Sequence, residues 1–123
     1  MTPASSILNP NSNPDLYVAA VLTLYLDLPD TPLRTNASDQ RQARTWFDRG
    51  LSPELVETAL LLASLRRRAR PITAPPLPRI RSLAYFQPVV EELVDQPPPT
   101  GYLQHLRLKL RHAVDTPRGG ASS

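Results

Sequence analysis

Apolar side chains recur along this chain at the three- and four-residue spacing of amphipathic helices, and proline, glycine or a capping residue bounds each apolar stretch. Nearly every position from 14 to 28 is apolar, and Asn13 and Pro14 suit the N-cap and the first helical position. Residues that precede a proline are pushed out of the helical region, so the segment Leu28–Pro32 should form a rigid turn. The pattern predicts a first helix that is covered on several sides.

Two further helices are predicted on either side of Gly50. Ser38 is the expected N-cap of a helix that runs to about Phe47, and Gly50 stops that helix, because glycine adopts the left-handed C′ conformation at little cost. Ser52 and Pro53 then restart a helix at once, as N-cap and first helical position. The two helices should form a compact corner.

Proline segments divide the second half of the chain. Prolines between positions 71 and 78 forbid a helix and predict an extended connector. Ser82 is expected to cap a shorter helical segment, inside which Pro88 either kinks the helix or marks a second start. After the prolines at 97–99, Thr100 is expected to cap a last helix. The narrow apolar strip of that helix consists of Leu103, Leu106 and Leu110.

These segments predict one all-α domain, a small bundle of four to five helices with proline-rich connectors and disordered termini. Strand alternation and internal repeats are absent from the sequence. The expected domain covers residues 14–113, between a disordered arm at 1–13 and a disordered tail at 114–123. Four aromatic residues fall at inward positions and are expected in the core rather than as base-stacking platforms: Trp46, Phe47, Tyr85 and Phe86.

The amino-acid composition restricts the kinds of functional site that the chain can form. The 123 residues are 41% hydrophobic and 20% charged, which is enough apolar material for a packed core. With no cysteine and only His105 and His112 as histidines, we expect no disulfide, no metal site and no cofactor. No signal peptide is recognised, and the longest apolar run, Leu16–Leu26, falls short of the roughly 20 residues that span a bilayer. A cytoplasmic protein that does not enter a membrane is therefore predicted.

Catalytic motifs are also missing. The glycines stand at 50, 101, 119 and 120, so no phosphate-binding loop is present. Both histidines belong to the basic last helix rather than to a predicted cleft with a nucleophile. Glu91 and Glu92 point to different faces of a helix and suit a solvated surface better than an acid–base pair. The sequence predicts no enzyme and no catalytic residue.

Charge is distributed unevenly along the chain. Residues 1–60 hold four basic and seven acidic residues, whereas residues 61–123 hold ten and four. Almost all the cations are arginine, which binds phosphate in a bidentate manner and stacks on bases. A solvated surface that complements helix dipoles, or a site for an acidic protein, would also account for them. The predicted nucleic-acid-binding residues are Arg66, Arg67, Arg68, Arg70, Arg79, Arg81, Arg107, Lys109 and Arg111.

The segment from about Ser38 to Lys109 resembles the C-terminal helical domain of DnaD-like primosome and replication-initiation proteins. The helix that ends at Gly50 and the apolar helix that follows resemble the first part of that domain. Tyr85, Val89 and Leu93 fall on the spacing at which the family has tyrosine, an aliphatic residue and tryptophan. The sequence departs from the family at Leu93, which replaces the tryptophan, and at Pro88, which interrupts the motif. The resemblance implies DNA binding, also by the basic segment behind the domain, and contact with other replication proteins.

Two functions remain open from the sequence. The first is a small DNA-associated accessory protein, in replication initiation of a mobile element, that contacts nucleic acid through the basic residues. The second is a protein-interaction module without nucleic-acid binding, in which the nearly all-apolar helix Leu16–Leu28 docks on a partner chain or on a second copy.

Overall fold

A computed structural model describes residues 12–115 of the protein, and every regular element in this range is helical. No strand occurs within these residues, which confirms the predicted all-α bundle. The predicted arm and tail fall mostly outside the described residues, and the last helix continues to Asp115. The elements are α2 (Pro14–Leu26), α3 (Ala37–Asp48), α4 (Pro53–Arg68), a short 3₁₀ helix η1 (Leu83–Phe86), α5 (Gln87–Asp95) and α6 (Tyr102–Asp115).

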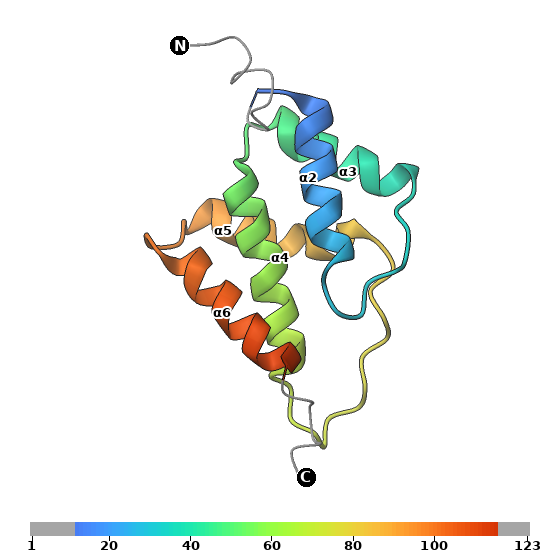
Figure 1. Ribbon diagram of the computed structural model, residues 1–123, viewed down its shortest axis with the longest axis vertical. Coiled ribbons are helices and arrows are strands. Elements are labelled where there is room, and N and C mark those ends of the chain that lie inside the picture. Colours follow the sequence, from blue (N-terminus) through green and yellow to red (C-terminus); the bar gives the residue numbers. More distant parts are fainter. Residues whose placement is uncertain (1–11, 116–123) are drawn as a thin grey trace.

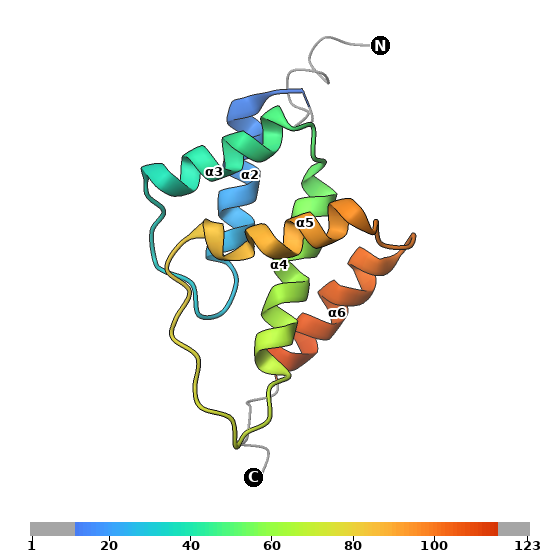
Figure 2. The same cartoon turned by 180° about the vertical axis from the view of Figure 1, so that it is seen from behind.

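Helix α4 is the centre of the bundle and contacts α2, η1, α5 and α6. Figures 1 and 2 show α2 and α3 packed together near the start of α4, whereas α6 runs beside its C-terminal half. The predicted apolar first helix is thus covered by α3 and α4, against which Tyr17, Val21 and Tyr25 are buried. The largest fully buried side chains of the core include Trp46, Tyr17, Tyr25, Phe86 and Leu60.

The starts of α2 and α4 agree with the sequence. Asn13 Oδ1 accepts hydrogen bonds from the backbone N–H groups of Asp15 and Leu16 at 2.9 and 3.2 Å. Ser52 Oγ accepts from the N–H of Leu55 at 3.1 Å, and proline occupies the first turn of both helices. These side chains satisfy N–H groups that have no partner within their own helix.

The start of α3 corrects the sequence prediction. Its N-cap is Asn36, and Ser38 lies inside the first turn. Asn36 Oδ1 accepts from the N–H of Asp39 at 3.0 Å, while Asp39 Oδ2 accepts from the N–H of Asn36 at 3.1 Å. This reciprocal capping box satisfies two backbone donors, whereas a serine cap would satisfy one.

The corner between α3 and α4 has the predicted form. Gly50 has φ of 78°, and its N–H donates to the carbonyl of Phe47 at 2.9 Å. The N–H of Leu51 donates to the carbonyl of Trp46 at 3.2 Å. The two bonds make a Schellman motif, which ends α3 and allows the chain to turn into α4.

Pro88 marks a second helix start. The chain forms η1 first, and α5 then begins at Gln87 with Pro88 in its first turn, where the missing proline N–H costs no hydrogen bond. The last helix starts later than predicted, at Tyr102. Gly101, with φ of 87°, separates Thr100 from it, so Thr100 is not the residue that precedes the helix.

Two side chains join α3 to η1 and α5. Asp39 is 1% exposed, and its Oδ1 accepts from the N–H of Leu83 at 2.9 Å. Gln87 Oε1 accepts from Trp46 Nε1 at 2.6 Å and from Gln42 Nε2 at 3.2 Å. These bonds fix where η1 lies, and with it the end of the proline-rich connector.

Candidate nucleic-acid interface

Most of the predicted basic residues gather around the C-terminal end of α4, whereas Arg107 reaches Glu57 in the first half of that helix. Figures 1 and 2 show that the C-terminal end of α6 lies beside it, and that the connector to η1 leaves from the same place. Arg68 Nη2 donates to the carbonyl of Ala113, in the last turn of α6, at 2.7 Å. Both helix ends present carbonyl groups with partial negative charge, so cations are favoured there.

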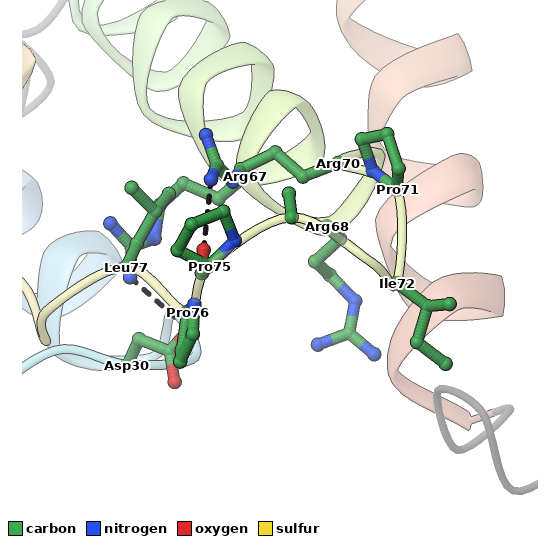
Figure 3. Close-up of a pocket in the computed structure, with 10 residues that line it drawn as sticks. Asp30, Arg67, Arg68, Arg70, Pro71, Ile72, Pro75, Pro76 and Leu77 are labelled. Atoms are coloured by element: carbon green, nitrogen blue, oxygen red, sulfur yellow. Dashed lines mark hydrogen bonds and ion pairs between the residues drawn. The ribbon is translucent and has the colours of Figure 1, made fainter.

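Arginines also hold the connector in place. Its prolines have no N–H to donate, and its backbone carbonyls accept hydrogen bonds from guanidinium groups instead. Arg67 Nη2 donates to the carbonyl of Pro78 and Arg70 Nη2 to that of Pro75, each at 2.9 Å. Figure 3 shows Arg70 reaching Pro75 and Arg67 reaching Asp30, whose carboxylate lies 3.6 Å away.

Arg67 is the most enclosed of these cations. Its side chain is 9% exposed, its Nη1 donates to the hydroxyl of Tyr85 at 3.2 Å, and its guanidinium carbon lies 5.4 Å from the centre of that ring. Its Nε is buried without a hydrogen-bond partner among the described residues. With its other bonds going to Pro78 and Asp30, Arg67 serves to fix η1 and the connector to α4.

Two predicted residues form bidentate ion pairs. Arg66 binds Glu92 at 2.9 and 2.6 Å, and Arg107 binds Glu57 at 2.8 and 2.7 Å. The hydrogen bond from Arg66 lowers the pKa of the Glu92 carboxyl. The hydrogen bonds to Glu92 and Glu57 likewise raise the pKa of Arg66 and of Arg107. In these two pairs, carboxylates of the same chain neutralise the cations.

Other predicted residues keep their charge uncompensated. Arg81, Lys109 and Arg111 are exposed, and within residues 12–115 they form no hydrogen bond or ion pair. Arg79 is also exposed, and its single hydrogen bond goes to a neutral group, the carbonyl of Thr31, at 3.3 Å.

Shallow hollows connect these cations into one surface. Lys109 and Arg68 line a hollow of about 330 Å³ between α4 and α6. Arg68 also lines a second hollow, of about 440 Å³, together with Arg67 and Arg70, and Arg67 reaches a third that contains Arg79 and Arg81. Arg111 lies beside Lys109 on the exposed side of α6. We call this surface the basic band, defined by Arg68, Arg70, Arg79, Arg81, Lys109 and Arg111.

Tyr85 departs from its predicted core position. Its side chain is 42% exposed and lines the hollow that contains Arg79 and Arg81, whereas Trp46 and Phe86 are fully buried and Phe47 is half-buried. The 3₁₀ geometry of η1 explains the difference. At three residues per turn, Leu83 and Phe86 share the inward face and leave Tyr85 outside.

The residues that neutralise or position the cations were not predicted from the sequence. Glu57 and Glu92 lie far in sequence from their arginine partners, by 50 and 26 positions respectively, so no local spacing reveals the pairs. Asp39 carried the one usable signal, because Asn36 and Asp39 have capping-box spacing. No group of three or more potential metal ligands occurs among residues 12–115, and no helix there is long and apolar enough to cross a membrane.

Comparison of the chain with models of known protein families, with curated proteins and with solved structures finds no match.

Proposed function

We propose that this protein is a small helical DNA-associated accessory protein that contacts the phosphate backbone through the basic band. One observation supports the proposal: three segments that are distant in sequence contribute cations to neighbouring hollows. They are the end of α4, the end of the connector and the exposed side of α6. Arg81, Lys109 and Arg111 have no carboxylate partner within residues 12–115. A polyanion is the ligand that compensates such a surface.

The expected mode of binding is electrostatic and largely independent of DNA sequence. The hollows are shallow, and their cations sit on different elements, which suits contacts to successive phosphates rather than to base edges in a groove. The affinity should fall steeply with salt, by about 0.9 in the logarithmic slope for each phosphate contacted. The more specific role, in replication initiation of a mobile element, rests on the family resemblance alone.

A pair of charge-reversal variants tests the proposal. The first carries Arg81→Glu and Lys109→Glu, within the basic band. The second carries Arg34→Glu and Arg41→Glu, whose arginines are also exposed and unpaired among the described residues but line none of the hollows of the basic band. Both variants change the net charge equally, so only position distinguishes them.

Fluorescence anisotropy with a labelled DNA duplex, at low and at moderate salt, gives the readout. We expect the first variant to bind at least about tenfold more weakly and to reduce the salt slope by about 2, with the second close to wild type. No binding of the wild-type protein at low salt would remove the proposal. Equal losses in both variants would show that net charge, and not the basic band, is responsible.

The second candidate, an interaction module built on Leu16–Leu28, has weaker structural support. The inner face of this helix is covered by α3 and α4, and its most exposed large apolar side chain, Leu26, is 37% exposed. Val18, Ala19 and Leu22 do line a shallow hollow of about 560 Å³ beside α3. Light scattering over a range of concentrations tests this candidate, since a self-docking helix should give a mass that rises with concentration.

A further inference from the structure

The proline-rich connector presents an exposed segment that the bundle does not use as core. Residues 75–78, Pro-Pro-Leu-Pro, are exposed and belong to no helix or strand. Proline fixes φ near −65°, and a residue before proline is held in the extended region, so every position in this segment is constrained toward polyproline II geometry.

Hydrogen bonding agrees with that geometry. The carbonyls of Pro75 and Pro78, three residues apart, both accept from arginines at the end of α4, at 2.9 Å each. Polyproline II has three residues per turn, so carbonyls at this spacing point in the same direction. The segment is therefore attached to the bundle along one side, through its backbone, while its proline rings remain exposed.

We propose that residues 75–78 are a preformed docking ridge for a protein domain whose groove is lined by aromatic side chains and bordered by carboxylates. Such grooves recognise polyproline II segments with a PxxP pattern, and Pro75 and Pro78 supply that pattern here. The arginines hold the segment in its extended form before binding, which reduces the conformational entropy that a partner must remove.

The positive charge around the ridge indicates that the groove of the partner has acidic side chains at its edges. One hollow of about 440 Å³ is lined by Pro75, Pro76 and Leu77, and another of about 440 Å³ is lined by Leu77 and Pro78. Arg68 and Arg70 line one hollow, and Arg79 and Arg81 line the other. Acidic side chains at the edges of the aromatic groove would face these cations.

The test uses the full chain with two probes, a purified WW domain and a purified SH3 domain, titrated while the tryptophan fluorescence of the probe or its NMR shifts are followed. The test variant carries Pro75→Ala and Pro78→Ala. The control variant carries Pro97→Ala and Pro99→Ala, in the second proline run of the chain, which lacks the PxxP spacing. Alanine keeps the carbonyl that each proline presents to the arginines.

We expect one of the probes to bind the wild-type chain and the control alike, and the test variant at least about tenfold more weakly. Failure of both probes to bind the wild-type chain, or equal binding of the test and control variants, would overturn the proposal. Circular dichroism verifies that the test variant folds. Should it not fold, Pro78→Ala alone replaces it, since it removes one proline of the PxxP pattern and keeps the carbonyl that accepts from Arg67. These variants leave every arginine in place, so DNA binding should be unchanged and the two proposals can fail separately.

Discussion

The two ends of α4 are built on different chemistry. Around its start, α2, α3 and η1 enclose the aromatic core, and two polar side chains, Asp39 and Gln87, turn inward to bind specific donors. Around its end, arginines turn along the surface to carbonyls of the connector or outward to Glu92, while Arg67 is enclosed against Tyr85. Trp46, Phe86 and Asp39 are fully buried around the first end, whereas Arg66 and Lys109 at the second end are exposed to water.

The difference predicts where stability and function reside. A polar group that loses its partner in a dry environment stays unsatisfied, whereas water replaces a lost partner at an exposed site. Substitutions near the start of α4 should therefore affect the free energy of unfolding, and substitutions near its end should affect binding. A surface whose side chains carry little of the folding free energy is free to bind a ligand.

The largest effect is expected at Asp39. The change Asp39→Ala removes the acceptor for the buried N–H of Leu83 and half of the capping box, and should lower the free energy of unfolding by about 2 to 4 kcal/mol. The control is Glu92→Ala, whose carboxylate is exposed and pairs with Arg66 at the end of α4, and which should change stability far less, because an exposed ion pair contributes little. Urea denaturation followed by circular dichroism measures both; equal losses would contradict the comparison.

Alkaline pH should act on the same end of the molecule. Burial raises the pKa of Tyr17 and of Tyr25 to about 12 from the ordinary value of 10, and the nearby Asp39 carboxylate adds to the shift at Tyr25. The unfolded chain releases these protons first, so the free energy of unfolding is constant below pH 10 and falls between pH 10 and 12. Above pH 12 the contribution of the two tyrosines is lost. Each tyrosine should contribute roughly 2 kcal/mol to that fall.

The matched variant for this titration is Tyr25→Phe, which keeps the edge-to-face contact with Phe86 at 6.0 Å and removes the ionisable hydroxyl. That hydroxyl is buried and has no hydrogen-bond partner among residues 12–115, so its removal should not destabilise the protein at neutral pH. Denaturation midpoints measured from pH 8 to 12 should show a shallower alkaline decline in the variant. An unchanged decline would mean that Tyr25 does not ionise on unfolding in this range.

Local signals in the sequence were enough for most of the fold. The caps at Asn13 and Ser52 and the stop at Gly50 depend on neighbours a few residues away, and all three appear as predicted. The two helix starts predicted at Ser38 and Thr100 are misplaced. At the first, Asn36 is the N-cap in place of Ser38, and at the second, Gly101 lies between Thr100 and the helix. Residues of similar capping propensity stand close together at such ends, so the exact start is hard to predict.

The candidate site was less predictable, because whether an arginine is paired or stays available for a ligand depends on residues that are distant in sequence. From the sequence, Arg66, Arg67, Arg68 and Arg81 are equivalent members of basic clusters. In the fold, Arg66 meets Glu92, Arg67 is enclosed by Tyr85, Arg68 meets a carbonyl of α6 and Arg81 meets nothing within the described residues. Only tertiary packing separates structural cations from those that remain for a ligand.

The smallest effect, and the one of opposite sign, is expected from releasing a neutralised cation. Glu92→Gln removes the carboxylate that pairs with Arg66, whose side chain is 51% exposed and lines the hollow with Arg68 and Lys109. Because the pair is exposed, stability should hardly change, while an extra cation beside the basic band should strengthen DNA binding by about two- to fivefold.

The neighbouring Glu91→Gln is a close control, since it raises the net charge equally but frees Arg49, which lines none of the hollows described for the basic band. Measured by anisotropy near physiological salt, where charges more than about 8 Å apart are largely screened, Glu92→Gln should exceed Glu91→Gln. Equal gains would mean that DNA responds to the total charge of the molecule, and that the difference between the two ends of α4 has no part in binding.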